Sequence, residues 1–200
     1  MLVTMHHEIY VVVETFQKKG SSILQHIGLL TGQGGDQVLE FFDIRPDFDL
    51  NLMKPNQDLF YTTASCLIQL QSLIAEIKPS LLMVQGDTTT AFAAALAGFY
   101  LKIPIAHVEA GLRTSEKYSP FPEEMNRRLI TPLADLYFAP TQRTKKNLMN
   151  EGIKESSITI SGNTSIDALL LGCKKQLSPP KNPNFVDSPK LILMTLHRRE

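Results

Sequence analysis

Strand-length apolar runs alternate with helical segments along most of this chain, and that alternation constrains the fold more than any other feature. An apolar stripe at helical spacing over 59–77 ends at Lys78, because a residue that precedes a proline avoids the helical region. Continuous apolar runs then follow at 80–85, 103–108, 135–140 and 157–163, each with a helical segment after it. This order is typical of a parallel sheet with helices on both faces, so the chain is predicted to be an α/β protein.

The two ends of the chain indicate how it divides into domains. Residues 9–16 (IYVVVETF) have the composition of one more strand. Residues 178–189 are rich in proline and polar groups, which indicates a linker, and the apolar run after them indicates a new strand. We therefore expect an N-terminal domain over 1–177, a linker over 178–189 and the first strand of a truncated second domain over 190–200.

Composition argues against several classes of partner. Lys+Arg and Asp+Glu number 20 each, so no basic field favours nucleic acid or a membrane surface. No apolar run reaches the roughly 18–20 residues of a membrane-spanning helix, and no signal-peptide pattern is present. Cys66 and Cys173 lie far apart in apolar helical segments, which favours two reduced, buried thiols of a cytosolic protein over a disulfide or a metal site.

Three acidic residues follow predicted strands or turns in this otherwise apolar part of the chain. Asp87 follows the run at 80–85, Glu109 follows the next run, and Glu123 follows a Pro-Phe-Pro turn. Residues just past parallel strands gather at one edge of the sheet, where open α/β sheets bind ligands. Because an unpaired buried charge is too costly for core packing, the three carboxylates are predicted to share a site at that edge. The hydroxyl of Thr88, at the start of a helix, suits an anionic ligand.

Each of these acids also has a structural interpretation. Asp87 can serve as the N-cap of the helix that follows it. Glu109 can form an ion pair with Arg113. Glu123 and Glu124 can complement the dipole of the helix that they open, and each has an arginine four residues further on.

Two histidines stand near predicted strand ends. For His107, inside an apolar run, a buried and hydrogen-bonded role is favoured over a catalytic one. His197 ends the last apolar run and is followed by Arg198, and cationic groups at that position would suit a diphosphate.

Several motifs occur in a recognisable order, namely GDTTT, HVEAGLRT, SPFPEEMNR, SGNTSIDAL and a terminal HRRE. Together they resemble the non-hydrolysing UDP-N-acetylglucosamine 2-epimerases, over about residues 31–200. The resemblance implies the N-terminal half of a GT-B fold, in which two Rossmann-like domains face each other across a cleft. It also implies a cytoplasmic, homodimeric enzyme that interconverts UDP-GlcNAc and UDP-ManNAc by elimination and re-addition of UDP, with no metal or nicotinamide cofactor.

The same resemblance implies roles for individual residues. The family's catalytic carboxylates match Asp87, Glu109 and Glu123, and removal and return of the C2 proton on opposite faces needs acid/base groups on both sides of the sugar ring. His197 matches the histidine that is assigned to the UDP leaving group. The residues expected to contact the substrate are Arg113, Arg198 and Thr88.

Two departures from the family pattern bear on activity. No GTRPE sequence, which shapes the nucleotide site in the family, occurs among the 200 residues. The family's TGQH segment, linked to a regulatory UDP-GlcNAc site, is replaced by TGQGG at 31–35. We therefore expect impaired epimerase activity in the isolated chain. Two alternatives remain, a non-catalytic epimerase-like binding protein and a fragment of a glycosyltransferase with the same fold.

Overall fold

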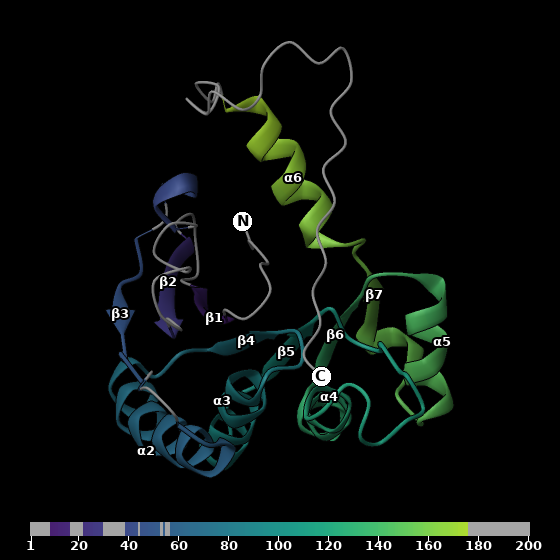
Figure 1. The fold of residues 1–200 in the computed structure, drawn as a ribbon, viewed down its shortest axis with the longest axis horizontal. Coiled ribbons are helices and arrows are strands. Elements are labelled where there is room, and N and C mark those ends of the chain that lie inside the picture. Colours follow the sequence, from purple (N-terminus) through teal and green to yellow (C-terminus); the bar gives the residue numbers. More distant parts are fainter. Residues whose placement is uncertain are drawn as a thin grey trace, which may run out of the picture.

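The fold is built on one mixed sheet, seen in the computed structural model, which describes residues 9–16, 22–29, 39–43, 45–52, 54 and 57–175. The strands are β1 (Ile9–Phe16), β2 (Ser22–Leu29), β3 (Phe48–Asp49), β4 (Leu81–Gln85), β5 (Ile105–Val108), β6 (Leu136–Ala139) and β7 (Ile158–Ile160). They lie side by side in the order β3-β2-β1-β4-β5-β6-β7 (Figure 1). Strands β4 to β7 pair in parallel, which confirms the predicted α/β class.

Helices cover both sides of this sheet. They are α2 (Leu59–Ile77), α3 (Thr89–Tyr100), α4 (Glu123–Ile130), α5 (Gln142–Asn150) and α6 (Thr164–Lys174), with short 3-10 turns at Thr131–Leu133 and Glu155–Ser157. In Figure 1, α2, α3 and α4 lie on one side of the sheet and α6 rises from the other. Each parallel strand is thus followed by a helix, as the alternation predicted.

The first strand departs from the parallel pattern. Residues 9–16 do form the predicted strand, but β1 runs antiparallel to both of its neighbours, with Val12 opposite His26 of β2 and Met83 of β4. A short connection is enough to join antiparallel strands, whereas parallel strands need a longer crossover. The strand–helix alternation begins only after this hairpin, so it carried no information about the direction of β1.

Local signals set the ends of the helices where the sequence indicated them. Helix α2 ends at Lys78, which adopts a left-handed conformation directly before Pro79. Helix α5 begins with a capping box between Thr141 and Thr144, and Gly152 follows its C-terminal end with φ of +90°. At both helix ends, residues within a few positions determine where the helix stops or starts. The sequence alone was therefore enough to locate them.

The main core lies between α2, α3 and the parallel strands. Alanines of α3 pack closely there, and a Cβ atom at Gly98 would come within 2.8 Å of the Leu82 side chain. Cys66 is fully buried in this core, as predicted. The predicted burial of Cys173 is wrong, because this free cysteine is exposed on α6, a helix that buries only Ala168.

Two further expectations concern larger-scale organisation. Among the described helices, none combines the length and the apolar character needed to cross a membrane. The predicted linker over 178–189 and the strand of a second domain after it lie outside the described residues.

Candidate active site

The turn between β4 and α3 places Asp87 at the edge of the sheet. Gly86 adopts φ of +73°, a conformation that favours glycine, and its N–H donates to the Val108 carbonyl at 3.0 Å. The side chain of His107 donates from Nε2 to the Gly86 carbonyl at 2.8 Å. The N–H and the carbonyl of Gly86 are therefore both hydrogen-bonded to residues of β5, which fixes the backbone directly before Asp87.

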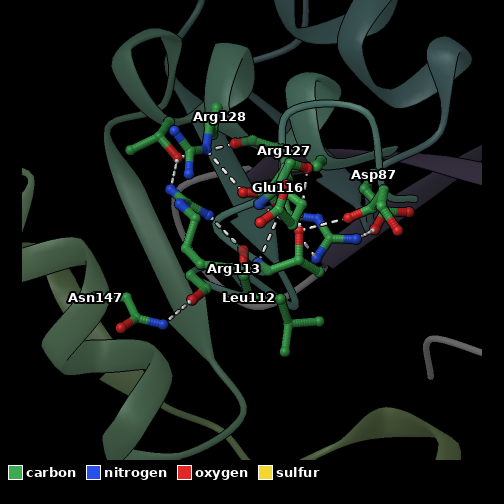
Figure 2. A network of polar contacts seen from close by, with 12 residues as sticks. Asp87, Leu112, Arg113, Glu116, Arg127, Arg128 and Asn147 are labelled. Atoms are coloured by element: carbon green, nitrogen blue, oxygen red, sulfur yellow. Dashed lines mark hydrogen bonds and ion pairs between the residues drawn. The ribbon is translucent and has the colours of Figure 1, made fainter. Parts of the chain in front are cut away.

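Asp87 is not the N-cap of α3, contrary to its structural interpretation. Thr88 takes that position, and its Oγ1 accepts a hydrogen bond from the Ala91 N–H at 3.3 Å. The Asp87 carboxylate is therefore not used on the helix that follows it. It faces α4 instead, where Arg127 donates from Nη2 to Asp87 Oδ2 at 2.5 Å (Figure 2).

The other two predicted acids lie close to Asp87. Glu109 directly follows β5 with φ of +66°, and its Oε2 is 3.8 Å from the position that a Cβ atom would take on Gly86. Glu123 is the first residue of α4, and its negative charge contributes to a raised pKa at Asp87. The ends of β4 and β5 and the start of α4 thus bring Asp87, Glu109 and Glu123 into one region at the sheet edge.

Burial and neighbouring charges compete at Asp87. Loss of solvent raises the pKa of this carboxyl most strongly, and the Glu123 carboxylate raises it further. The Arg127 guanidinium acts in the opposite direction, but the net pKa is raised. A carboxyl in this environment holds a proton more readily than an exposed aspartate does, which suits it to proton transfer.

Glu124, the neighbour of Glu123, is fully buried and belongs to a structural network. Its Oε2 accepts from the Thr114 N–H at 3.1 Å and lies 3.5 Å from Arg127 Nη1, while Oε1 accepts from Arg128 Nε at 2.8 Å. Burial tends to raise the pKa of Glu124, but these hydrogen bonds and charges outweigh it, so the pKa is lowered. Glu124 is thus held as a carboxylate, and its predicted pairing with Arg128 is confirmed.

His107 is a buried structural residue, in line with the favoured interpretation. Its side chain has no exposed surface, and burial lowers its pKa to about 4. The imidazole is therefore neutral at physiological pH. Since the Gly86 carbonyl can only accept, the proton of the neutral ring lies on Nε2.

Arg113 pairs with Glu151, the residue that follows α5. Its Nε and Nη2 donate to the two carboxylate oxygens of Glu151, each at 2.6 Å, and Nη2 also donates to Thr131 Oγ1 at 2.8 Å. Sequence reasoning missed Glu151 because it lies 38 residues away and carries no motif. The substrate contact expected of Arg113 stays a prediction.

Of the other predicted site residues, one lies in the described part of the chain and two lie outside it. Thr88 lies beside Asp87, with its hydroxyl engaged at the start of α3. His197 and Arg198, together with the TGQGG segment at 31–35, lie outside the described residues. One contact of Arg127 was also missed: its spacing on α4 indicated a partner on its own helix, and besides Glu124 of that helix it contacts Asp87 from another element.

Known proteins match this chain over most of its length. The family model for UDP-N-acetylglucosamine 2-epimerase matches residues 17–200. A Bacillus subtilis (strain 168) protein of that name is 52% identical over 165 residues, which cover 82% of this chain and 43% of the relative. The chain therefore spans less than half the length of this relative.

Solved structures agree with the sequence match. The Neisseria meningitidis UDP-GlcNAc 2-epimerase bound to UDP-GlcNAc is 49% identical, with a TM-score of 0.68 over 72% of this chain and 39% of that one. Staphylococcus aureus MnaA in complex with UDP is 48% identical, with a TM-score of 0.67 over 71% and 38%. On the strength of the family match and these identities, the chain belongs to the UDP-N-acetylglucosamine 2-epimerase family.

Proposed function

We propose that this chain supplies the catalytic carboxylates of a UDP-GlcNAc 2-epimerase, an isomerase that interconverts UDP-GlcNAc and UDP-ManNAc. The observation that carries the proposal is the gathering of Asp87, Glu109 and Glu123 at one sheet edge. Support for the ligand comes from the relatives, since the Neisseria meningitidis structure contains UDP-GlcNAc and the Staphylococcus aureus structure contains UDP.

The proposed reaction moves one proton and one leaving group. A carboxylate removes the proton from C2 of the sugar while the bond between C1 and the UDP oxygen breaks, which leaves a glycal with a C1–C2 double bond. UDP then adds back to C1 as a carboxylic acid returns a proton to the opposite face of C2. Acid/base groups are therefore needed on both faces of the ring, and three carboxyl groups in one region can provide them.

The electrostatics favour different roles for the acids. Asp87, with its raised pKa, suits the proton donor. Glu123, the first residue of α4, is proposed as the base that acts opposite Asp87. His197 and Arg198 are proposed to act on the UDP diphosphate, with Arg113 and Thr88 as further substrate contacts; those four assignments rest on the family match and on position in the sequence.

The remaining proposals concern organisation. We assign residues 1–177 to the N-terminal domain and 178–189 to a linker, followed by the first strand of a second domain. The enzyme is proposed to act in the cytoplasm as a homodimer, without a metal or nicotinamide cofactor.

Exposed apolar side chains on the adjacent helices α2 and α3 provide a surface for the proposed dimer, among them Ile68, Phe99 and Tyr100. Light scattering of the purified chain measures its mass and so tests whether it forms a dimer.

A chimera tests the activity directly. Residues 31–200 of this chain replace the matching segment of the Bacillus subtilis relative, so that the acids are presented in a protein of full family length. The chimera is incubated with UDP-GlcNAc in deuterated water, and NMR follows deuterium at C2 together with UDP-ManNAc. We expect both products, and a rate lower by about 10²–10⁴-fold in Asp87→Asn, Glu109→Gln and Glu123→Gln.

The control in this experiment is Glu116→Gln, which alters a nearby exposed acid outside the proposed set. It should leave the rate of deuterium incorporation almost unchanged. A folded chimera that binds UDP but incorporates no deuterium would contradict the proposal. That result would favour the alternative of a non-catalytic epimerase-like protein.

A further inference from the structure

The guanidinium of Arg127 connects Asp87 in the proposed active site to the buried network around Glu124. Arg127 lies on α4 with a side chain that is only 10% exposed, and it faces two carboxylates from different elements. Nη2 contacts Asp87 Oδ2 at 2.5 Å, and Nη1 lies 3.5 Å from Glu124 Oε2. The planar fork of an arginine is suited to bridging two carboxylates, whereas a lysine offers one point charge.

The Glu124 side of this bridge is buried and hydrogen-bonded. Glu124 has no exposed surface, and both of its oxygens are engaged by Thr114 and Arg128. The loop that supplies Thr114 is itself tied down, since Thr114 Oγ1 donates to the Ser119 carbonyl at 2.6 Å. Glu124 therefore gives Arg127 a fixed point from which the guanidinium reaches Asp87.

We propose that Arg127 is a positioning residue for Asp87, held in place by the buried carboxylate of Glu124. Asp87 experiences the like charge of Glu123 at the start of α4, and Glu109 lies next to Gly86 directly after β5. Arg127 is the cation that contacts it among the described residues. Arg127 thus directs the Asp87 carboxylate and limits the repulsion from its acidic neighbours. This inference deepens the proposed function, because it assigns a role in that same site.

A purely structural role makes a different prediction. If Arg127 acts only through Glu124 on its own helix, its replacement lowers stability and leaves the ionisation of Asp87 unchanged in the molecules that stay folded. If Arg127 positions Asp87, its replacement changes the ionisation equilibrium even where the fold is intact. The charged groups that face Asp87 and enter this equilibrium are Arg127 and Glu123, both from α4, while Glu109 lies near Gly86 directly after β5.

The experiment is an NMR titration of the Asp87 side-chain carboxyl carbon in the 200-residue chain, without substrate. Arg127→Gln removes the cation, so the midpoint should move upward by about one pH unit or more, the effect of losing an opposite charge in contact. Arg127→Lys restores a charge and should return the midpoint part of the way. Arg128→Gln is the matched control, because Arg128 contacts the same Glu124 but not Asp87, and it should leave the midpoint in place.

Each outcome separates the two roles. An Asp87 midpoint that is the same in the wild type, Arg127→Gln and Arg127→Lys would overturn the proposal, and so would an equal shift in Arg128→Gln. Should Arg127→Gln fail to fold, the comparison of Arg127→Lys with Arg128→Gln decides, since only the former alters the contact with Asp87. Deuterium exchange in the chimera tests the proposed function separately, so either idea can fail while the other stands.

Discussion

The imidazole of His107 donates from Nε2 to the carbonyl oxygen of Gly86 at 2.8 Å, which ties the centre of β5 to the residue before Asp87. The ring is fully buried, and its pKa is lowered to about 4 because burial disfavours the imidazolium. The geometry of the candidate site therefore depends on a histidine that must stay neutral. This requirement links the site to the stability of the fold.

His107 should make the folded state sensitive to acid. Its pKa is about 4 when folded against an ordinary value of 6.5, so the unfolded chain binds more protons between those pH values. Stability contributed by neutral His107 is full above pH 6.5 and is lost as the pH falls toward 4, at up to about 1.4 kcal/mol per pH unit. Urea unfolding across this range should show a steeper loss in the wild type than in His107→Gln; parallel losses would contradict the assignment.

Glu124 should matter more for stability than its exposed partner does. Glu124→Ala leaves the Thr114 N–H without its acceptor and removes one of the two carboxylates that Arg127 contacts, at a cost of about 1–3 kcal/mol. Arg128→Ala breaks the same network at a side chain that is 42% exposed, so about 0–1 kcal/mol is expected. Denaturant unfolding of both variants at neutral pH measures the difference. Equal losses would mean that Glu124 is not the anchor of the network.

Gly111 should tolerate no side chain, because the backbone of α5 passes directly over it. It has φ of +88°, and a Cβ atom there would overlap the Thr144 carbonyl oxygen. Gly152 has a similar φ of +90° but open space around it. Gly152→Ala should therefore cost only the left-handed strain of about 1–2 kcal/mol, and Gly111→Ala distinctly more. Thermal unfolding of the two variants separates the cost of steric overlap from the cost of backbone strain. Similar losses of stability in both variants would contradict the close approach of the Thr144 carbonyl to Gly111.

The two cysteines should differ sharply in reactivity. Cys66 is fully buried, and burial raises its pKa to about 11, whereas Cys173 is exposed. A thiol reagent at mildly alkaline pH should modify Cys173 rapidly and Cys66 only after denaturation, since the thiolate is the reactive form. Cys173→Ser should abolish the fast phase and keep the slow one. Two equally fast phases in the native wild type would show that Cys66 is accessible.

Local patterns in the sequence determined much of this fold. The end of α2 at Lys78 depends on Pro79, and the start of α5 depends on the hydroxyls of Thr141 and Thr144, so a few adjacent residues carry the whole signal. The parallel strands were equally readable, because strands buried on both faces appear as continuous apolar runs. That Asp87 and Glu109 would approach each other followed from the rule that the ends of parallel strands share an edge.

Tertiary structure decided what those side chains contact. The direction of β1, the pairing of Arg113 with Glu151 and the contact of Arg127 with Asp87 all join segments far apart in the chain. Residue type shows that a charge needs a partner, but the choice among several arginines and acids depends on distances that exist only after packing. Exposure of Cys173 likewise depends on how little of α6 is covered. The sequence thus determined the elements, the edge where the acids meet and the pairing of Glu124 with Arg128 within α4, whereas packing determined which charges from different elements pair there.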